Sequence, residues 1–581
     1  MRGAEPTPHP ATIPDQQQRG TMMRADPTPL LHILSDDLLA LVVSGVQGKN
    51  GLRQVDHSLR AAVNACTSSL TWSRPKASSA GGALRVRNPH LPAALTAACP
   101  GIRLLDCSGR GIDEPRLEVV LESIPPSLCT LLCSYTQLEH LDPLAAACAM
   151  TLQTLDCSST QVEDLSPLAA CRMLRSLCCR SCTLVADLGP LAACTLLRSL
   201  DCSNTEVADL GPLAACTMLQ TLNCCDTDVA GLGPLAACVT LRTLNFSNTR
   251  VAALGPLAAC TMLQTLDFSL CNLVADLCPL TACSVLRTLD CSLCSGVSDL
   301  GPLSKCTALQ TLNCFSTEVA ELGPLSACTA LQALNCSKCT GVTTLGPLSW
   351  CTHLTSLNLS KCVQVTDLTP LAPCTKMQTL EFSGCNRVTK LGPLASCTLL
   401  RTLNCSLSHV ADLGPLSACT LLHTLDCSLS HVGDLGPLAA CRQLCSLSCI
   451  GCSRVSKLGP LAACTLLQTL KCNGCTKVTE LGALASCTVL QTLNCSLTHV
   501  TDLAPLAACP LLRELDCSDC QRLSDLGPLA SCTRLQALKC DNELPTEQVQ
   551  RLQAACSSLV VKLVEDCVVR NVLSATNPAT A

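Results

Sequence analysis

The sequence predicts an α/β solenoid with a curved parallel β-sheet on its concave side, short helical or 3-10 turns on its convex side, and a small N-terminal helical module. A pattern that recurs every 22 or 23 residues is the first indication. Each period also holds a short strand signature and a Gly-Pro pair where a helical turn begins. A repeat of this length cannot bury an apolar face alone, so stacked repeats share one elongated core.

One representative repeat runs from Leu197 to Met218 and reads LRSLDCSNTEVADLGPLAACTM. Leu200 and Cys202 are alternate positions, as a short half-buried strand requires. Gly211-Pro212 places proline at the start of a helical turn, where its missing N–H would have no helical partner. This succession of strand, corner and helical turn resembles the leucine-rich repeat family.

The central strand leucines define about twenty repeats between residues 84 and 540. At about 4.8 Å for each strand, their sheet would be roughly 90–100 Å long along its arc. The leucines are Leu105, Leu131, Leu155, Leu177, Leu200, Leu222, Leu244, Leu266, Leu289, Leu312, Leu334, Leu357, Leu380, Leu403, Leu425, Leu447, Leu470, Leu493, Leu515 and Leu538.

The length of each regular repeat follows the residue five places after its leucine. Cysteine there, as in Cys182 or Cys452, accompanies an interval of 23 residues, whereas Thr or Ser, as in Thr205, accompanies 22. We infer that this residue faces inward, and that a thiol and a hydroxyl favour different backbone paths. The short form resembles the repeats of internalins and phosphatase-regulating proteins, and the long form resembles the cysteine-containing repeats of F-box proteins.

The 52 cysteines fall into three ladders, one on the inward strand position, one closing the helical turn and one at the long-repeat corner. Phe246, Phe268, Leu359 and Phe382 replace cysteine on the strand, which indicates an apolar buried site. Disulfides or a metal array are the alternative, but parallel side chains bridge poorly and no regular histidine accompanies the thiols. Free thiols in this number favour a reducing compartment, the cytoplasm or the nucleus.

Residues 30–72 contain two apolar helical segments, and Leu34-Ser35-Asp36-Asp37, Leu52 to Val55, Leu59-Arg60 and Trp72 resemble the F-box. Ser35 replaces the usual proline, and Val46 to Asn50 disturbs the middle of the pattern. The resemblance implies docking onto a Skp-type adaptor of a cullin ubiquitin ligase. The alternative is a plain helical cap over the first repeat. The candidate adaptor-binding residues are Leu34, Leu38, Leu41, Val42, Leu52, Val55 and Leu59.

The segments outside the repeats differ in composition. Residues 1–29 are polar and predicted to be a disordered leader, and the Met22-Met23 pair leaves the translation start open. Residues 73–83 are a Gly- and Ser-rich linker. Residues 541–567 are predicted to form a C-terminal cap, with a helix from Pro545-Thr546 and a last strand near Leu559 to Leu563, and 568–581 are a tail.

Composition disfavours several classes of function. The net charge of −5, the lack of a basic tract and only seven aromatic residues disfavour nucleic-acid binding. We expect no membrane span and no secretory signal, because neither apolar pattern is present. No phosphate-binding loop, zinc-protease motif or nucleophile elbow occurs, so we expect a protein that is not an enzyme and has no cofactor or metal.

Irregular surface positions are the best candidates for partner binding. Leu407 with His409, Leu429 with His431, and Leu497 with His499 place an exposed apolar residue two positions before a histidine. Tyr135 and Phe315 are other large side chains expected to point outward. Incidental surface is the alternative. Asp or Asn follows the central leucine of most strands, as at Asp156 and Asp201, and predicts a mildly acidic concave face. This face is either a solvated surface or a docking surface for a basic partner.

The sequence therefore predicts an interaction protein, monomeric outside a complex. In the first interpretation the repeats bind a protein client and residues 30–72 bind a Skp-type adaptor, as the F-box resemblance implies. In the second, the chain is a freestanding intracellular scaffold with no link to ubiquitin ligases.

Overall fold

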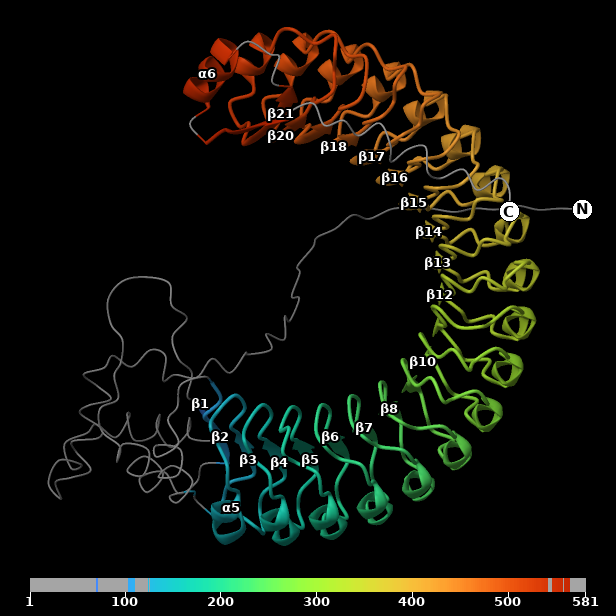
Figure 1. Ribbon diagram of the computed structural model, residues 1–581. Coiled ribbons are helices and arrows are strands. Elements are labelled where there is room, and N and C mark those ends of the chain that lie inside the picture. Colours follow the sequence, from blue (N-terminus) through green and yellow to red (C-terminus); the bar gives the residue numbers. More distant parts are fainter. Residues whose placement is uncertain are drawn as a thin grey trace, which may run out of the picture.

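A computed structural model describes residues 69–71, 103–109, 124, 126–541, 546–556 and 558–564. Within these residues, 22 strands form one parallel sheet, and each strand pairs with the next along the chain. Figure 1 shows a horseshoe, with the strands along the inner side and the helical turns along the outer side. This arrangement confirms the predicted solenoid and the placement of its two layers.

The strands are short, and most of them have three residues, with one inward leucine between two neighbours. They are β1 (Ser69–Thr71), β2 (Leu104–Asp106), β3 (Thr130–Leu132), β4 (Thr154–Asp156), β5 (Ser176–Cys178), β6 (Ser199–Asp201), β7 (Thr221–Asn223), β8 (Thr243–Asn245), β9 (Thr265–Asp267), β10 (Thr288–Asp290), β11 (Thr311–Asn313), β12 (Ala333–Asn335), β13 (Ser356–Asn358), β14 (Thr379–Glu381), β15 (Thr402–Asn404), β16 (Thr424–Asp426), β17 (Ser446–Ser448), β18 (Thr469–Lys471), β19 (Thr492–Asn494), β20 (Glu514–Asp516), β21 (Ala537–Asp541) and β22 (Val560–Val564).

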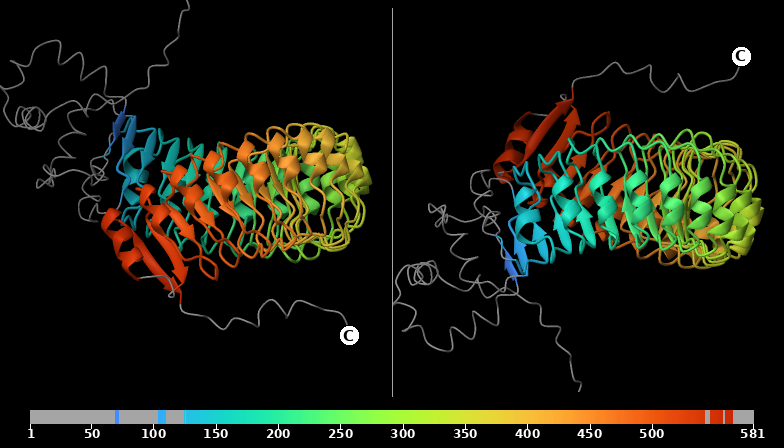
Figure 2. Two further views of the ribbon diagram at one scale, coloured as in Figure 1. Left: turned by 90° about the horizontal axis from the view of Figure 1, so that it is seen from above. Right: turned by 90° about the horizontal axis from the view of Figure 1, so that it is seen from below.

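The outer layer consists mainly of 3-10 turns, most of which carry proline in their first positions. The α-helices within the described residues are α5 (Asp142–Ala147) and α6 (Thr546–Ala555). The 3-10 helices are η3 (Ser166–Ala170), η4 (Gly189–Ala193), η5 (Gly211–Ala215), η6 (Gly233–Ala237), η7 (Gly255–Ala259), η8 (Cys278–Ala282), η9 (Gly301–Lys305), η10 (Gly323–Ala327), η11 (Gly346–Trp350), η12 (Thr369–Leu371), η13 (Gly392–Ser396), η14 (Gly414–Ala418), η15 (Gly436–Ala440), η16 (Gly459–Ala463), η17 (Gly482–Ser486), η18 (Ala504–Ala508) and η19 (Gly527–Ser531). Figure 2 shows these turns stacked in one row along the outer side.

Identical register along the sheet builds a continuous core. Leu289 pairs with Leu312 and Leu312 with Leu334, so each leucine packs on the same residue of its neighbours. The inward strand thiols, such as Cys202, are fully buried, and the described cysteines are free. Phe246 and Phe268 stack within the same ladder, with ring centroids 5.8 Å apart. The thiols are therefore core residues, as the apolar substitutions predict.

Different hydrogen bonds at the corner explain the two repeat lengths. In a short repeat, the Thr205 hydroxyl donates to the carbonyl of Cys202 in its own repeat, at 2.7 Å. In a long repeat, the Cys182 thiol donates to the carbonyl of Cys157 in the preceding repeat, at 3.0 Å. The extra residue lets the thiol reach across to that carbonyl while the side chain stays buried. Corner residues of both kinds therefore face inward, as the sequence analysis infers.

We expect the corner residue and the repeat length to be coupled energetically. Cys452→Thr alone places a hydroxyl on the long path, away from the carbonyl of Cys427 that the thiol contacts at 3.1 Å. The same substitution with Ser453 deleted restores the short path. Equilibrium unfolding in guanidinium should show that the single variant loses about 1–3 kcal/mol and that the deletion recovers at least half of that loss. A deletion variant less stable than Cys452→Thr would contradict the coupling.

The two ends of the sheet are closed by different means. At the C-terminal end, α6 and β22 lie where a helix and a last strand are predicted, and Leu552, Cys556 and Leu559 are buried against the last repeat. At the other end, β1 pairs with β2, so the sheet begins inside the segment 30–72 expected to be helical. A strand satisfies the backbone groups that β2 would otherwise expose.

Several expected segments lie outside the described residues. They are the leader (1–29), the adaptor-binding residues Leu34 to Leu59, Trp72, the linker (73–83), and the tail (568–581). No helix among the described residues is long and apolar enough to cross a membrane.

Candidate functional site

The most distinctive surface is the lateral flank formed by the corners that follow each strand. One row of this flank, here called the corner row, has a left-handed backbone with φ near +55° to +75° in most repeats. Asn, Asp and Gly tolerate this conformation, whereas a leucine there is strained by about 1–2 kcal/mol. Leucine nevertheless occupies the corner row at Leu270, Leu293, Leu407, Leu429 and Leu497.

The corner-row leucines are also exposed. Leu407 is 50% exposed, and Leu429 and Leu497 are each 48% exposed. Folding does not require them, because serine, lysine or glycine stands at the same position in other repeats. Strained backbone together with exposed apolar surface is typical of a functional position.

Histidines lie beside the leucines on the same flank. His409 and His431 stack face to face, with ring centroids 4.8 Å apart and an interplanar angle of 10°. Desolvation by its neighbours, the charge of His409 and that of Arg454 hold the pKa of the exposed His431 below its ordinary value. His499 lies three repeats further along, and its Nδ1 contacts the carbonyl of Thr476. The structure thus brings Leu407, His409, Leu429 and His431 together as one patch.

The two remaining partner candidates lie elsewhere along the solenoid. Tyr135 is 52% exposed at a left-handed corner near the N-terminal end of the described repeats. Phe315 is half-buried, and the Lys338 ammonium lies 4.8 Å from its ring centroid. Neither residue lies in the leucine–histidine patch.

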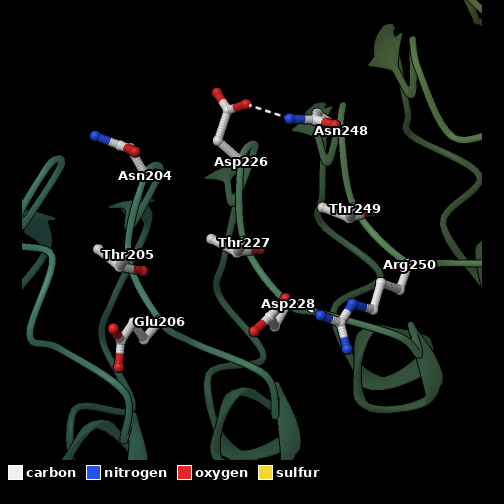
Figure 3. A pocket seen from close by; sticks show the side chains of 9 residues that line it. All are labelled: Asn204, Thr205, Glu206, Asp226, Thr227, Asp228, Asn248, Thr249 and Arg250. Carbon is white, nitrogen blue, oxygen red and sulfur yellow. Dashed lines mark hydrogen bonds and ion pairs between the residues drawn. The ribbon is translucent and has the colours of Figure 1, made fainter.

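A shallow polar depression lies on the flank of three earlier repeats, with a volume of about 510 Å³ (Figure 3). Its side chains largely satisfy each other, because Asn248 donates to Asp226 at 2.7 Å and Arg250 pairs with Asp228 at 2.9 Å. This depression could not be predicted from the sequence, because its residues come from separate repeats and match no motif. Their common place in the repeat is the only sequence signal.

The carboxylates of the predicted acidic stripe on the concave face accept hydrogen bonds from residues of their own repeats. Asp201 Oδ1 accepts hydrogen bonds from the backbone N–H and the hydroxyl of Ser203, at 3.0 and 2.6 Å. Asp156 and Asp290 bind the following serine in the same way. These carboxylates therefore stabilise the strand ends and have less capacity to bind a partner.

Removing strain from the patch should stabilise the chain. Asparagine tolerates the left-handed backbone, so Leu407→Asn is expected to raise the free energy of unfolding by about 0.5–1 kcal/mol. Guanidinium unfolding measures the difference, with Ser316→Asn at a corner without leucine as the control. A destabilised Leu407→Asn variant would show that the leucine has a structural role.

Thiol reactivity should follow burial. Burial raises the pKa of Cys216 to about 11, whereas hydrogen bonds lower that of Cys182, which is also buried, to about 6. Among the described cysteines Cys278 is exposed, and its hydrogen bond with Asp276 raises its pKa. Brief maleimide labelling followed by peptide mapping should modify Cys278 before the buried thiols, including Cys182.

The labelling should also depend on pH in a defined direction. A raised pKa leaves little Cys278 thiolate at pH 7, so its labelling rate rises with pH. Asp276→Asn removes the negative partner and should speed labelling of Cys278 at pH 7 several-fold. Equal rates in the two proteins would contradict the role of Asp276.

The described residues contain no group of three or more His, Cys, Asp or Glu side chains that could hold a metal ion. Parallel strands, 3-10 turns and leucine ladders instead define the described part of the chain as a leucine-rich repeat solenoid. Proteins of this class are typically binding scaffolds. The arrangement offers surfaces for contact with another protein, and its stacked repeats give those surfaces a regular spacing.

Comparisons with known proteins agree with this class. Residues 488–531 match the family model described as leucine-rich repeats in two copies. No curated protein matches the chain in sequence.

Three solved structures illustrate the likeness. An internalin, InlF of Listeria monocytogenes, is 22% identical over 57% of this chain and 84% of its own, with a TM-score of 0.42. The functional domain of InlJ from the same organism, which includes a cysteine ladder, is 22% identical over 68% of each chain, with a TM-score of 0.38. The plant peptide hormone receptor RGFR1, in complex with RGF2, is 15% identical over 82% of this chain and 93% of its own, with a TM-score of 0.46.

Proposed function

We propose that this chain recognises a protein client through its repeats and joins a cullin ubiquitin ligase through residues 30–72. The observation that carries client recognition is the patch of Leu407, His409, Leu429 and His431, where strained leucines stay exposed beside stacked histidines. Partner binding would supply the burial that these leucines lack in the free chain.

The ligase assignment rests on the sequence. Leu34, Leu38, Leu52, Val55 and Leu59 stand at the matching places of the F-box pattern. The long repeats, which resemble the cysteine-containing repeats of F-box proteins, support the same assignment. The chain would then select the client, while other subunits carry out ubiquitin transfer.

A freestanding scaffold is the second candidate. Ser35 in place of the usual proline and the disturbed segment Val46 to Asn50 favour it, because both alter the adaptor-binding module. In either case the free thiols are suited to a reducing compartment, so we propose the cytoplasm or the nucleus.

Co-expression of the full chain with a Skp-type adaptor separates the two candidates. The wild type should capture the adaptor, and Leu38→Asp with Leu59→Asp should abolish capture. The matched control, Leu407→Asp with Leu429→Asp, changes exposed leucines on the repeats and should leave capture unchanged. A folded wild-type chain that captures no adaptor would refute the ligase assignment and leave the scaffold.

A further inference from the structure

A row of cationic or protonatable side chains runs along the C-terminal half of the flank, beside the corner row. In each repeat it occupies the position immediately before the inward valine or leucine that follows the corner. Here it is called the basic strip, and its members in consecutive repeats are Arg387, His409, His431, Arg454, Lys477, His499 and Arg522. All of them are exposed.

Contacts between successive repeats show that residues at this position are neighbours in space. The His431 backbone N–H donates to the carbonyl of Val410 in the preceding repeat, at 2.9 Å. Arg387 Nη1 donates to Gln364 Oε1, which stands at the same position one repeat earlier, at 2.7 Å. His409 and His431 stack directly. The strip is therefore a continuous line of side chains, at about one strand spacing per residue.

The charge of this line is specific to the C-terminal half. At the same position in earlier repeats, acidic Glu206, Asp228 and Glu318 accompany Arg250, which is paired with Asp228. Arg387, Arg454, Lys477 and Arg522 take part in none of the ion pairs found among the described residues. The chain as a whole carries a net charge of −5, so a line with four cations outside any ion pair is opposite in sign to the overall charge.

Other charged groups lie further along each repeat. Three residues after the strip, roughly 10 Å along extended backbone, stand Lys390, Asp412, Asp434, Lys457, Glu480, Asp502 and Asp525. Several of these carboxylates accept backbone hydrogen bonds at the start of a 3-10 turn, Asp412 from Gly414 at 2.7 Å and Asp434 from Gly436 at 2.8 Å. None of these carboxylates forms an ion pair with a strip cation among the described residues.

The corner row supplies an apolar ridge along the other edge of the strip. Leu429 leans over Gly451, since its Cδ2 lies 2.6 Å from where a Cβ of Gly451 would stand. Gly451 and Gly474 have φ of +68° and +74°, and Leu497 is the next residue of this row. The leucines thus lie two residues before the histidines, and Gly451 and Gly474 lie three residues before Arg454 and Lys477.

We infer that the basic strip and this ridge form a docking surface for an extended acidic peptide segment of a partner protein, with apolar side chains at alternate positions. Side chains of an extended peptide alternate in direction, so one set can contact Leu407 and Leu429 while carboxylates face the cations. The strip spans about 29 Å between its end residues at about 4.8 Å per repeat, which an extended peptide of about nine residues matches. This inference deepens the proposed function, on which it rests for the existence of a protein client.

A protein fits this surface better than a nucleic acid. The apolar ridge has no counterpart in a phosphate backbone. Single-stranded nucleic acid would also require aromatic platforms for its bases, whereas Phe382 is buried and the exposed Tyr135 and Trp350 stand in repeats before the strip. The stacked histidine rings face each other and are not splayed to receive bases.

The test measures fluorescence anisotropy of a labelled nonapeptide that alternates glutamate with leucine and serine, titrated with the full chain without any adaptor. We expect binding that weakens at least fivefold between 50 and 300 mM NaCl and is lost when glutamine replaces glutamate. The variant R387E/R454E/K477E/R522E should bind at least tenfold more weakly. The control R172E/K305E/R442E/R534E makes the same charge change at exposed positions in or beside the outer turns and should stay within twofold of wild type.

A further measurement tests the ridge. Leu407→Asn with Leu429→Asn should weaken peptide binding without lowering stability.

Three outcomes would overturn the inference. They are no binding by the wild-type chain, equal losses in the strip variant and its control, and oligouridylate binding more tightly than the peptide. Because the adaptor is absent, a failure here leaves the ligase assignment standing. A failed adaptor capture, in turn, leaves the peptide-binding result valid.

Discussion

Phe246→Ala is expected to destabilise the solenoid by about 3–5 kcal/mol, with a similar loss for Phe268→Ala. Both rings are fully buried in the strand ladder that is otherwise mostly cysteine, and they stack with centroids 5.8 Å apart. Each substitution removes a large side chain from a closely packed interior and leaves a cavity. Guanidinium unfolding, followed by circular dichroism with reductant present, measures the loss.

The double variant tests whether the rings act as a pair. Since stacked rings contribute about 0.5–1.5 kcal/mol beyond their burial, the two losses should sum to more than the loss in the double variant. Phe382→Ala, in a ladder position with no stacked neighbour ring, should add to Phe246→Ala without coupling. Hydrogen exchange would locate the damage, because a repeat array can open locally. Strict additivity of Phe246→Ala and Phe268→Ala would contradict the stacking contribution.

A chain that ends at Asp541 should aggregate, whereas a chain that ends at Val564 should remain monomeric. The shorter chain lacks α6 and β22, which cover the last repeat and pair with β21 over five residues. It also loses Gln548, whose Oε1 accepts the backbone N–H of Leu526 at 2.7 Å. Removing them exposes Leu535, Leu538 and a free sheet edge, and such surfaces associate.

Light scattering coupled to size-exclusion chromatography gives the result directly. A point variant, Leu552→Asp, keeps the length and should weaken the cap through a buried charge on α6. If the chain ending at Asp541 were monomeric and as thermally stable as the longer one, α6 and β22 would have no capping role.

The repeat architecture was predictable because one residue type dominates each inward position. The strand leucines, the corner rule for Cys182 and Thr205, and the buried thiols each follow from one position of the aligned repeats. The structure adds the atomic reason for the two repeat lengths, since a thiol and a hydroxyl bind carbonyls of different repeats.

The flank was predictable only in part. Leu407 and His409 were predicted as irregular surface residues, but the left-handed backbone conformation of Leu407 was not. Serine, lysine, leucine and glycine share that conformation at the corner row, so composition gives no consistent signal. The basic strip was not predicted from the sequence, because its residues are 22 or 23 positions apart and form a line only when the repeats stack. Residues 30–72 stay a prediction apart from β1, which forms part of the sheet.

The buried thiol ladders have a consequence for the fate of the chain once it opens. Folded repeats hold each sulfur against a carbonyl or another apolar group, as Cys194 lies 3.4 Å from the carbonyl of Leu168. An opened array exposes dozens of thiols at once, and dissolved oxygen can oxidise neighbouring pairs of them to disulfides that the folded repeats do not contain. Without reductant, melting should therefore be a one-way event, with cooling curves that fail to retrace the heating curves.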